Sequence, residues 1–369
     1  MKIIQVIPSL NSGGAERFTV DLSNQLAEMG HEVILLVFFS RADQNFYLPD
    51  VSSKVRVITL GKRLGFDFKL LFKIYNIVKS EKPDVVQTHL YSLDYMPICI
   101  LLNKSVKYFH VVHSDAFKES QRKSSSLIRR WCFRNNKVCA VTISEQSLKS
   151  FEEMYGINAP LIYNGRKIPS VINTDLVRDE IAQYMKSDKT RIIAQVASVC
   201  PLKRQDLMAR VSKRLEEEGY DFAVLFIGRE HHNPDFLRKV KDVNCESCHI
   251  LGEKSNPLEY LKVADGFALC SEYEGLPISL LEAMAMGAVP VCTPVGGIVN
   301  VVIDGDNGIL SNTKEESDYY EALKRFLSLS CEALSKMKNS AIESFNPYKI
   351  DYCATQYIEL YSATTKVKN

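Results

Sequence analysis

The chain is organised around one stretch of sequence, Ser271-Glu-Tyr-Glu-Gly-Leu-Pro-Ile-Ser-Leu-Leu-Glu-Ala-Met-Ala-Met-Gly287. Pro277 suits the first turn of a helix and Gly287 suits its left-handed end, and the residues between them are apolar on nearly every face. This pattern predicts a buried helix. The helix nevertheless contains Glu282, and Glu274 lies in the loop before it. Two carboxylates beside a helix N-terminus indicate a site for a polar ligand, although a core ion pair for Glu282 and a solvated Glu274 fit this stretch equally well.

The length and composition of the chain predict a folded protein with two domains. With 369 residues, the chain is too long for one ordinary core. Its hydrophobic content of 46% and its net charge of +2 are typical of a globular protein. It contains no apolar run long enough to span a membrane and no secretory signal. We therefore expect a cytoplasmic protein whose ten cysteines are reduced.

The first part of the chain alternates between predicted strands and helices. Apolar runs typical of buried strands occur at residues 2–7, 31–39, 55–60, 85–89, 108–113 and 138–143. The turn Gly13-Gly14 between the first strand and its helix can present free N–H groups to a phosphate, although a merely tight turn explains it equally well. His89 and His113 stand at the ends of two strands. Ligands bind outside the carboxyl ends of strands in open α/β sheets, so these histidines are candidates for a binding site as well as for structural roles.

A polar stretch, which predicts a linker and one helix, is followed by a second α/β unit. Strands are predicted at residues 191–199, 222–228, 250–252, 266–269 and 289–292, and helices at 205–219, 258–264, 316–329, 331–344 and 347–363. The sequence thus indicates an α/β fold with one domain at residues 1–165 and another at 166–346. We expect the last helix, at about 347–369, to pack back on the first domain.

Several short segments resemble the motifs of a known family, in the same order along the chain. They are Ser12-Gly-Gly-Ala-Glu16 with Gly30-His-Glu-Val33, Pro83-Asp-Val-Val86 with His89 and then His113, Ser144 with Tyr163-Asn-Gly165, Glu274-Gly-Leu-Pro277 with Glu282-Ala-Met-Ala285, Pro294-Val-Gly-Gly297, and Asn307-Gly308. Together they resemble the family-4 retaining glycosyltransferases. The GT-B architecture of that family has two facing Rossmann-like domains, each a parallel sheet flanked by helices, with a cleft between them.

The resemblance implies a glycosyltransferase that works without a metal or other cofactor. A UDP- or GDP-sugar would be the donor, and a glycan or polyprenyl-linked molecule the acceptor, in polysaccharide biosynthesis. The resemblance gives catalytic roles to His113 near the transferred sugar, to Glu274 at the sugar hydroxyls and to Lys203 at the diphosphate. It places Glu282 at the ribose and His89 on the acceptor side. The further donor-binding positions that it implies are Gly13, Gly14, Ser198, Arg204, Gly228, Gly275 and Leu276.

One position departs from the family pattern. The family usually has an arginine five residues before the phosphate-binding lysine, and this chain has Ser198 there. Serine supplies no positive charge to a diphosphate, and the sequence leaves open whether Arg204 compensates. A second hypothesis is therefore a catalytically weakened nucleotide-sugar-binding protein of the same fold. A nicotinamide-dependent oxidoreductase is disfavoured, because the Gly-x-Gly-x-x-Gly fingerprint is absent.

A basic segment at residues 118–137 also indicates a partner. Its basic residues Arg122, Lys123, Arg129, Arg130 and Arg134 surround the only tryptophan, Trp131. Basic side chains interleaved with apolar ones suit an anionic membrane surface, and a solvated helix packed through its apolar side fits as well. The membrane interpretation would place the protein on the inner face of the plasma membrane. Nucleic acid is a less suitable partner, because the net charge is small and no binding module is visible.

Overall fold

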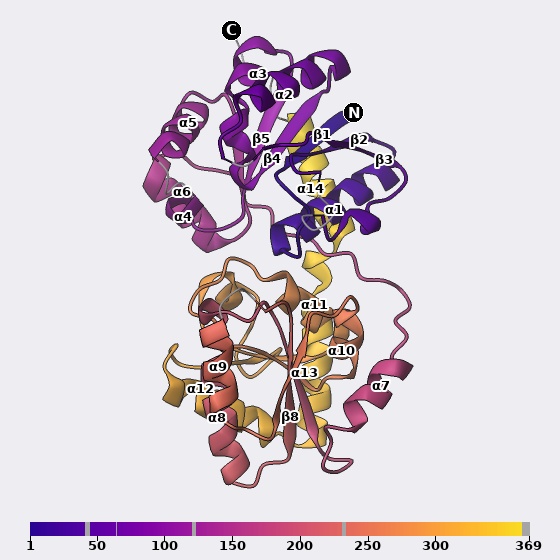
Figure 1. The fold of residues 1–369 in the computed structure, drawn as a ribbon, viewed down its shortest axis with the longest axis vertical. Helices are drawn as coiled ribbons and strands as arrows, with labels where there is room; N and C mark the ends of the chain where they lie inside the picture. Colours follow the sequence, from indigo (N-terminus) through magenta and orange to yellow (C-terminus); the bar gives the residue numbers. More distant parts are fainter. Residues whose placement is uncertain (41–44, 64, 120–122, 231–233, 364–369) are drawn as a thin grey trace. The chain divides into compact units, whose positions relative to one another are not determined.

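The structure is a computed structural model that describes residues 1–40, 45–63, 65–119, 123–230 and 234–363 (Figure 1). The chain forms two compact units, one made of residues 1–167 with 347–369 and the other of residues 168–346. Each unit contains its own six-stranded parallel sheet. The sequence predicted the six strands of the first sheet and five of the second, and missed the short strand Ile309–Leu310. None of the described helices is both long and apolar enough to cross a membrane.

The sheet of the first unit has the strand order β3-β2-β1-β4-β5-β6. Its strands are β1 (Lys2–Ile7), β2 (Glu32–Val37), β3 (Val55–Thr59), β4 (Val85–His89), β5 (Lys107–Val112) and β6 (Cys139–Thr142). All neighbouring strands in it are parallel. The strand order reverses between β1 and β4, and such a switch point is where open α/β sheets bind ligands. The Gly13-Gly14 turn follows β1, and His89 ends β4.

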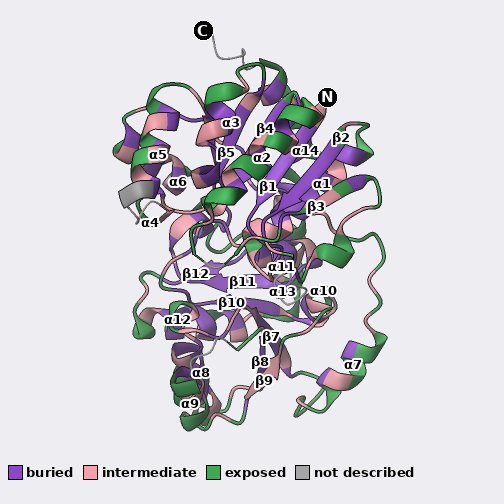
Figure 2. Ribbon diagram, turned by 45° about the horizontal axis from the view of Figure 1, so that its top comes forward, coloured by how far each residue is buried: buried purple, intermediate pink, exposed green. Residues whose placement is uncertain are grey.

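The helices of the first unit cover both faces of this sheet. They are α1 (Gly14–Glu28), α2 (Phe68–Glu81), α3 (Pro97–Leu102), α4 (Ala116–Glu119), α5 (Lys123–Arg134), α6 (Glu145–Tyr155) and α14 (Ile350–Ala363), with the 3-10 helix η3 (Leu90–Tyr95) after β4. Figure 2 shows the strands buried and the outer faces of the helices exposed. The chain returns to this unit through α14, where the Tyr361 hydroxyl donates to Oε1 of Gln87 at 2.5 Å.

The sheet of the second unit has the order β12-β11-β10-β7-β8-β9. Its strands are β7 (Arg191–Val196), β8 (Phe222–Ile227), β9 (Cys248–Gly252), β10 (Gly266–Leu269), β11 (Val289–Cys292) and β12 (Ile309–Leu310). Its helices are α7 (Asp175–Ala182), α8 (Gln205–Glu217), α9 (Pro234–Asp242), α10 (Pro257–Val263), α11 (Ile278–Met286), α12 (Glu316–Leu327) and α13 (Cys331–Ser344). The order reverses between β10 and β7, so the loops that follow these two strands meet at the same edge of the sheet.

Helix α11 is the buried helix that the sequence predicted. Its apolar residues lie in the core, with Leu280 and Met284 fully buried, and Glu282 is only 7% exposed. Pro277 is the residue before the first helical position rather than in the first turn, with a φ of −69° that leads into the helix. Gly287 ends the helix at a φ of +80°, a left-handed conformation that favours glycine.

Candidate functional site

A lysine and a glutamate meet at the switch point of the second sheet. Lys203 lies in the loop after β7, and Glu274 in the loop after β10. Because β7 and β10 are parallel neighbours, their carboxyl ends bring these loops together. Nζ of Lys203 lies 2.5 Å from Oε1 of Glu274, and the same oxygen accepts from the Ser271 hydroxyl at 2.6 Å. Glu274 is 7% exposed, so these two donors compensate the burial of its charge.

The chemistry of this pair suits a phosphorylated sugar. A lysine ammonium is a compact cation that attracts phosphate oxygens. A carboxylate accepts hydrogen bonds from hydroxyl groups and can exchange the Ser271 hydroxyl for those of a ligand. The structure therefore brings together two of the residues that the sequence analysis named for donor binding.

The glycine-containing loop at residues 294–297 packs closely against the segment that contains Glu274. Gly296 has a φ of +60°, and a Cβ added there would lie 2.0 Å from the Glu274 carbonyl oxygen. The next residue, Gly297, donates its N–H to the Gly275 carbonyl at 2.6 Å. Any side chain at Gly296 would therefore displace the Glu274 loop. This contact gives a physical reason for the Pro294-Val-Gly-Gly297 motif.

Gly228 allows a similarly close approach of two backbone segments, beside Ser198. A Cβ at Gly228 would lie 2.1 Å from the Ala197 carbonyl oxygen and 3.1 Å from the Ser198 nitrogen. The glycine thus allows the segment after β7 to pass close to the end of β8. Nε2 of Gln205 donates to the Ser198 carbonyl at 3.0 Å, which fixes this segment at the start of α8.

Arg204 has different partners from its neighbour Lys203. Its backbone is left-handed, with a φ of +53°, and Nη1 donates to the Lys314 carbonyl at 2.6 Å. The same nitrogen lies 3.5 Å from Oε2 of Glu272. In this structure Arg204 therefore neutralises Glu272 and stands apart from the Lys203–Glu274 pair.

The two strand-end histidines of the first unit are in direct contact. Nδ1 of His89 lies 2.9 Å from Nε2 of His113, and Nε2 of His89 lies 2.8 Å from Oε1 of Gln5. Because an amide oxygen only accepts, Nε2 of His89 carries the proton, and its Nδ1 accepts from Nε2–H of His113. Nδ1 of His113 is buried and has no hydrogen-bond partner among the described residues.

Both rings are neutral at pH 7. Burial lowers the pKa of His113 to about 4 against the opposing effect of the Glu119 carboxylate, and burial together with the neighbouring histidines lowers the pKa of His89 well below its usual range. The pair thus offers a ligand neutral hydrogen-bonding groups and no positive charge.

The first turn of α1 contains an acid, Glu16, that the sequence analysis did not single out as a site residue. A Cβ at Gly13 would lie 2.3 Å from Oε2 of Glu16, so the Glu16 carboxyl folds back over the Gly13-Gly14 turn. Burial raises the pKa of Glu16 to about 7. The preference of acidic residues for the first turn of a helix was the sequence signal.

The basic segment at residues 118–137 differs from the membrane-facing surface that we considered. Arg129 is 2% exposed and pairs with Glu119 at 3.0 Å, so the prediction that Arg129 faces lipid is wrong. Nε of Arg134 donates to the Tyr155 carbonyl at 3.0 Å. Trp131 is partly buried against the core of the unit, whereas Arg130 is exposed. Arg122 lies outside the described residues, as does the side chain of Lys123.

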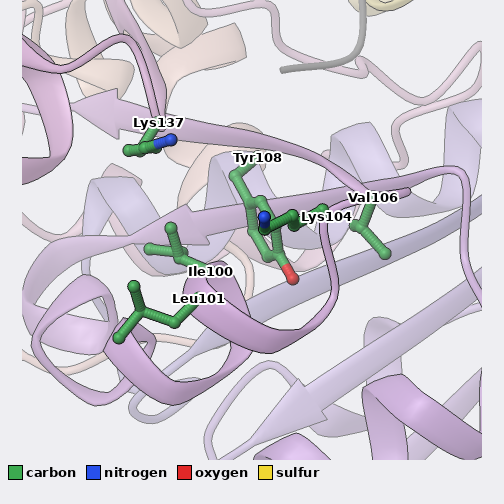
Figure 3. A pocket seen from close by; sticks show the side chains of 6 residues that line it. All are labelled: Ile100, Leu101, Lys104, Val106, Tyr108 and Lys137. Atoms are coloured by element: carbon green, nitrogen blue, oxygen red, sulfur yellow. The ribbon is translucent and has the colours of Figure 1, made fainter. Parts of the chain in front are cut away.

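A small cavity of the first unit lies away from these residues. It has a volume of about 50 Å³ and is lined by Ile100, Leu101, Lys104, Val106, Tyr108 and Lys137 (Figure 3). Val106 precedes β5 and Tyr108 lies at its start, whereas His113 follows its end. The cavity is therefore at the opposite edge of the sheet from the histidines and is too small for a sugar nucleotide.

No group of three or more His, Cys, Asp or Glu side chains within the described ranges could hold a metal ion. The independence of the reaction from metal remains a prediction.

Comparisons with known proteins match both units of the chain. The family model described as "Glycosyltransferase Family 4" matches residues 12–167, and the one described as "Glycosyl transferases group 1" matches residues 177–344. The N-acetyl-alpha-D-glucosaminyl L-malate synthase of Bacillus anthracis is 26% identical, covering 95% of this chain and 93% of that protein. The UDP-Gal:alpha-D-GlcNAc-diphosphoundecaprenol alpha-1,3-galactosyltransferase of Escherichia coli is 24% identical, covering 85% of this chain and 86% of that protein.

Solved structures share the fold over the whole chain. The crystal structure of HepE from Anabaena in complex with UDP has a TM-score of 0.82 and 17% sequence identity, covering 99% of this chain and 100% of that chain. The fold is that of the two-domain glycosyltransferases, the GT-B architecture. With both family models matched in order, the chain belongs to the family-4 glycosyltransferases.

Proposed function

We propose that this glycosyltransferase moves a sugar from a nucleotide-diphosphate donor to a glycan or lipid-linked acceptor, with retention of anomeric configuration, in polysaccharide biosynthesis. The contact between Lys203 and Glu274 at the switch point of the second sheet carries the proposal. The relatives support the substrate classes. The Escherichia coli protein is named for UDP-Gal and a diphosphoundecaprenol acceptor, and the HepE structure contains UDP.

Lys203 and Glu274 take separate parts in this proposal. Departure of the nucleotide leaves negative charge on the diphosphate, and the Lys203 ammonium stabilises that charge as it develops. Glu274 accepts hydrogen bonds from sugar hydroxyls and orients the ring, and Glu282 receives the ribose hydroxyls. His113 contacts the transferred sugar as a neutral ring, which its lowered pKa supports.

Weakened transfer is the second candidate function. Ser198 supplies no charge, and Arg204 is engaged with Glu272 and the Lys314 carbonyl. A protein of this kind would bind a nucleotide sugar tightly and transfer it slowly.

The deciding experiment offers purified protein a panel of UDP- and GDP-sugars with glycan and polyprenyl-diphosphate acceptors, in EDTA and in Mg²⁺. Mass spectrometry identifies the product, and NMR of its anomeric proton gives the stereochemistry. Lys203→Met should strongly reduce the amount of product. Lys314→Met is the matched control, because Lys314 also pairs with a glutamate, Glu272, but on the surface. Nucleotide-sugar binding without any product in either buffer would favour the weakened protein, and an inverted product would refute retention.

We also propose a peripheral contact with an anionic membrane surface, which would suit a lipid-linked acceptor. Within the basic segment, Arg130 and Leu127 are exposed, and Leu127 is 69% exposed. Helix α2 offers a second surface, because Phe68 and Phe72 are 71% and 59% exposed on one face. Lys69 and Lys73 stand beside these phenylalanines in the sequence, and basic residues with exposed aromatic rings suit an interfacial helix.

Sedimentation with vesicles of phosphatidylglycerol and phosphatidylethanolamine separates the two surfaces. If the basic segment makes the contact, Leu127→Ser with Arg130→Gln reduces binding and Phe68→Ser with Phe72→Ser does not. The reverse result would assign the contact to α2. Equal sedimentation of wild type and both variants would refute a membrane role for either surface.

A further inference from the structure

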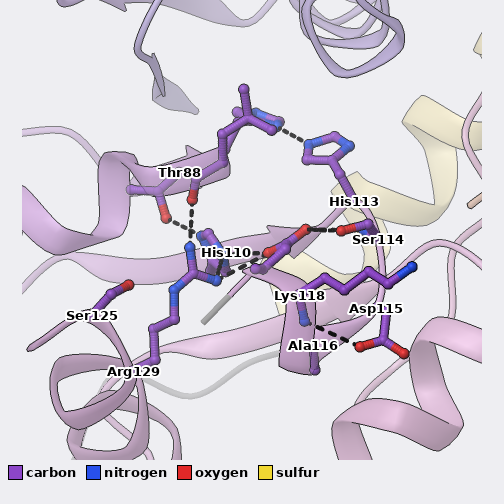
Figure 4. A network of polar contacts seen from close by, with 12 residues as sticks. Thr88, His110, His113, Ser114, Asp115, Ala116, Lys118, Ser125 and Arg129 are labelled. Atoms are coloured by element: carbon purple, nitrogen blue, oxygen red, sulfur yellow. Dashed lines mark hydrogen bonds and ion pairs between the residues drawn. The ribbon is translucent and has the colours of Figure 1, made fainter. Parts of the chain in front are cut away.

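A buried arginine contacts the chain next to the two strand-end histidines of the first unit. Arg129 comes from α5, and its guanidinium donates to acceptors in other segments of the chain (Figure 4). Nη1 donates to Oε2 of Glu119 at 3.0 Å, and Nη2 donates to the Leu90 carbonyl at 2.8 Å. The side chain is almost fully buried, with 2% exposed. These partners hold the buried guanidinium in one place, because Glu119 is its nearest counter-charge and Asp94 lies farther away, with Oδ1 3.8 Å from Nε of Arg129.

These two partners lead directly to the histidines. Leu90 is the residue after His89, so Arg129 holds the backbone at the end of β4. Oε1 of Glu119 accepts from the backbone N–H of Ser114 at 2.9 Å, and Ser114 is the residue after His113. One guanidinium is therefore linked to the chain immediately beyond both histidines.

The backbone at Leu90 needs such support. Its φ is +55°, a left-handed conformation that is unfavourable for leucine. Conformations of this kind persist only where surrounding contacts hold them. The hydrogen bond from Arg129 to the Leu90 carbonyl is such a contact, and it fixes the exit of the chain from His89.

The third partner of the guanidinium is His110, whose ring completes the network. Nη1 of Arg129 lies 3.0 Å from Nε2 of His110. Because a guanidinium only donates, this nitrogen carries no proton, and Nδ1 is the protonated one. Nδ1–H therefore donates to the Thr88 hydroxyl at 2.9 Å, and that hydroxyl donates to the Phe109 carbonyl at 3.1 Å. Each ring nitrogen of His110 therefore has one partner and a fixed protonation, whereas Nε of Arg129 has no hydrogen-bond partner among the described residues and lies 3.8 Å from Oδ1 of Asp94.

We propose that Arg129 is a positioning residue for the transfer reaction, which acts with Glu119 to fix the places and the hydrogen-bonded arrangement of His89 and His113. The inference rests on the proposed contact of His113 with the transferred sugar. Arg129 touches no substrate. It acts through the backbone of Leu90 and Ser114, and its loss leaves the histidine pair free to turn and to exchange its protons.

The test compares Arg129→Lys with the wild type. Lysine keeps the charge but lacks the planar fork that reaches Glu119 and Leu90 together. A misplacement of a reacting group by 1 Å costs on the order of 100-fold in rate, so we expect kcat to fall by roughly that factor. The Kd of the nucleotide diphosphate, whose proposed ligand Lys203 is in the second unit, should change less than about threefold. Arg56→Lys is the matched control, since Arg56 pairs with Glu81 on the surface of the same unit.

Histidine ring NMR supplies a readout that does not need turnover. Long-range ¹H–¹⁵N correlation spectra of histidine-labelled protein show which ring nitrogen of His89, His110 and His113 carries the proton. We expect one tautomer for each ring in the wild type and in Arg56→Lys, and mixed tautomers for His89 and His113 in Arg129→Lys. If Arg129→Lys does not fold, Glu119→Gln carries the same test, because it removes the charge that links Arg129 to Ser114.

The outcomes separate this inference from the proposed function. Mixed tautomers together with the fall in kcat support the inference. A folded variant with unchanged histidine signals overturns it whatever its rate, and so does wild-type kcat with mixed tautomers. If the wild type transfers no sugar at all, the proposed function fails, and single tautomers in Arg129→Lys would then show that Arg129 does not fix the pair.

Discussion

Removing the ammonium of Lys203 should slow sugar transfer by roughly 100-fold. A unit charge about 4 Å from a diphosphate oxygen contributes about 4 kcal/mol at an intermediate effective dielectric. The Lys203 side chain is still 20% exposed, so solvent screening reduces this value, and we expect about 2.7 kcal/mol. Each 1.36 kcal/mol is tenfold in rate. Because the charge on the leaving group grows in the transition state, most of this loss should appear in kcat rather than in donor affinity.

Two measurements on Lys203→Met test this reasoning. Steady-state kinetics gives kcat, and titration calorimetry gives the Kd of the nucleotide diphosphate. The variant also leaves Glu274 with the Ser271 hydroxyl as its one remaining partner of the two that the structure shows, so thermal unfolding must confirm that it is folded at the assay temperature.

Ser198→Arg provides a second arm of the same test. If the new arginine reaches the diphosphate, it should tighten nucleotide binding or raise kcat. Lys203→Met should then cost less in that background, and a double-mutant cycle measures the coupling. A nearly unchanged kcat in Lys203→Met with a severe loss in Arg204→Met would show that Arg204 rather than Lys203 serves the diphosphate. If neither Lys203→Met nor Arg204→Met changes kcat, the diphosphate binds elsewhere.

Three further predictions concern single residues. Glu274→Ala should abolish transfer while the protein stays folded, and near-normal turnover would refute the role of this carboxylate. Gly296→Ala should destabilise the second unit by about 1–3 kcal/mol in urea unfolding, because its Cβ would lie 2.0 Å from a carbonyl oxygen, whereas Gly305→Ala, with open space around it, should cost less. His110 should destabilise the protein in acid: burial and the neighbouring Arg129 lower its pKa from 6.5 to about 4, so the unfolded state alone binds a proton between these values. The free energy of unfolding should therefore fall by about 3 kcal/mol between pH 6.5 and pH 4. Urea unfolding measures this change, and a free energy of unfolding that stays constant over this range would contradict the prediction.

The strands of both sheets could be predicted from the sequence, because parallel strands buried on both faces are continuous apolar runs. The predicted bounds of β1, β4, β10 and β11 agree with the structure. Helix α6 was missed although its signal was present, since Ser144 caps it and Leu148, Phe151 and Tyr155 recur at helical spacing. The strand order could not be predicted in this way, because no local sequence pattern encodes which strands are neighbours. The contact between Lys203 and Glu274 depends on β7 lying beside β10, and only the family resemblance indicated it in advance.

The error at Arg129 has a physical explanation. Hydropathy places arginine outside and leucine inside, yet in α5 Arg129 is 2% exposed and Leu127 is 69% exposed. The acceptors that stabilise the buried guanidinium are Glu119 and the Leu90 carbonyl. Leu90 is 39 residues away in the sequence, and composition within the segment carries no information about an acceptor at that distance.

The close approach of Gly296 to the Glu274 carbonyl also links two loops mechanically. With no side chain between them, the loop after β10 cannot shift towards a ligand unless residues 294–297 shift with it. The hydrogen bond from Gly297 N–H to the Gly275 carbonyl at 2.6 Å crosses this junction. Hydrogen exchange at the Gly297 amide thus reports movement of the Glu274 loop from a position that need not touch the ligand.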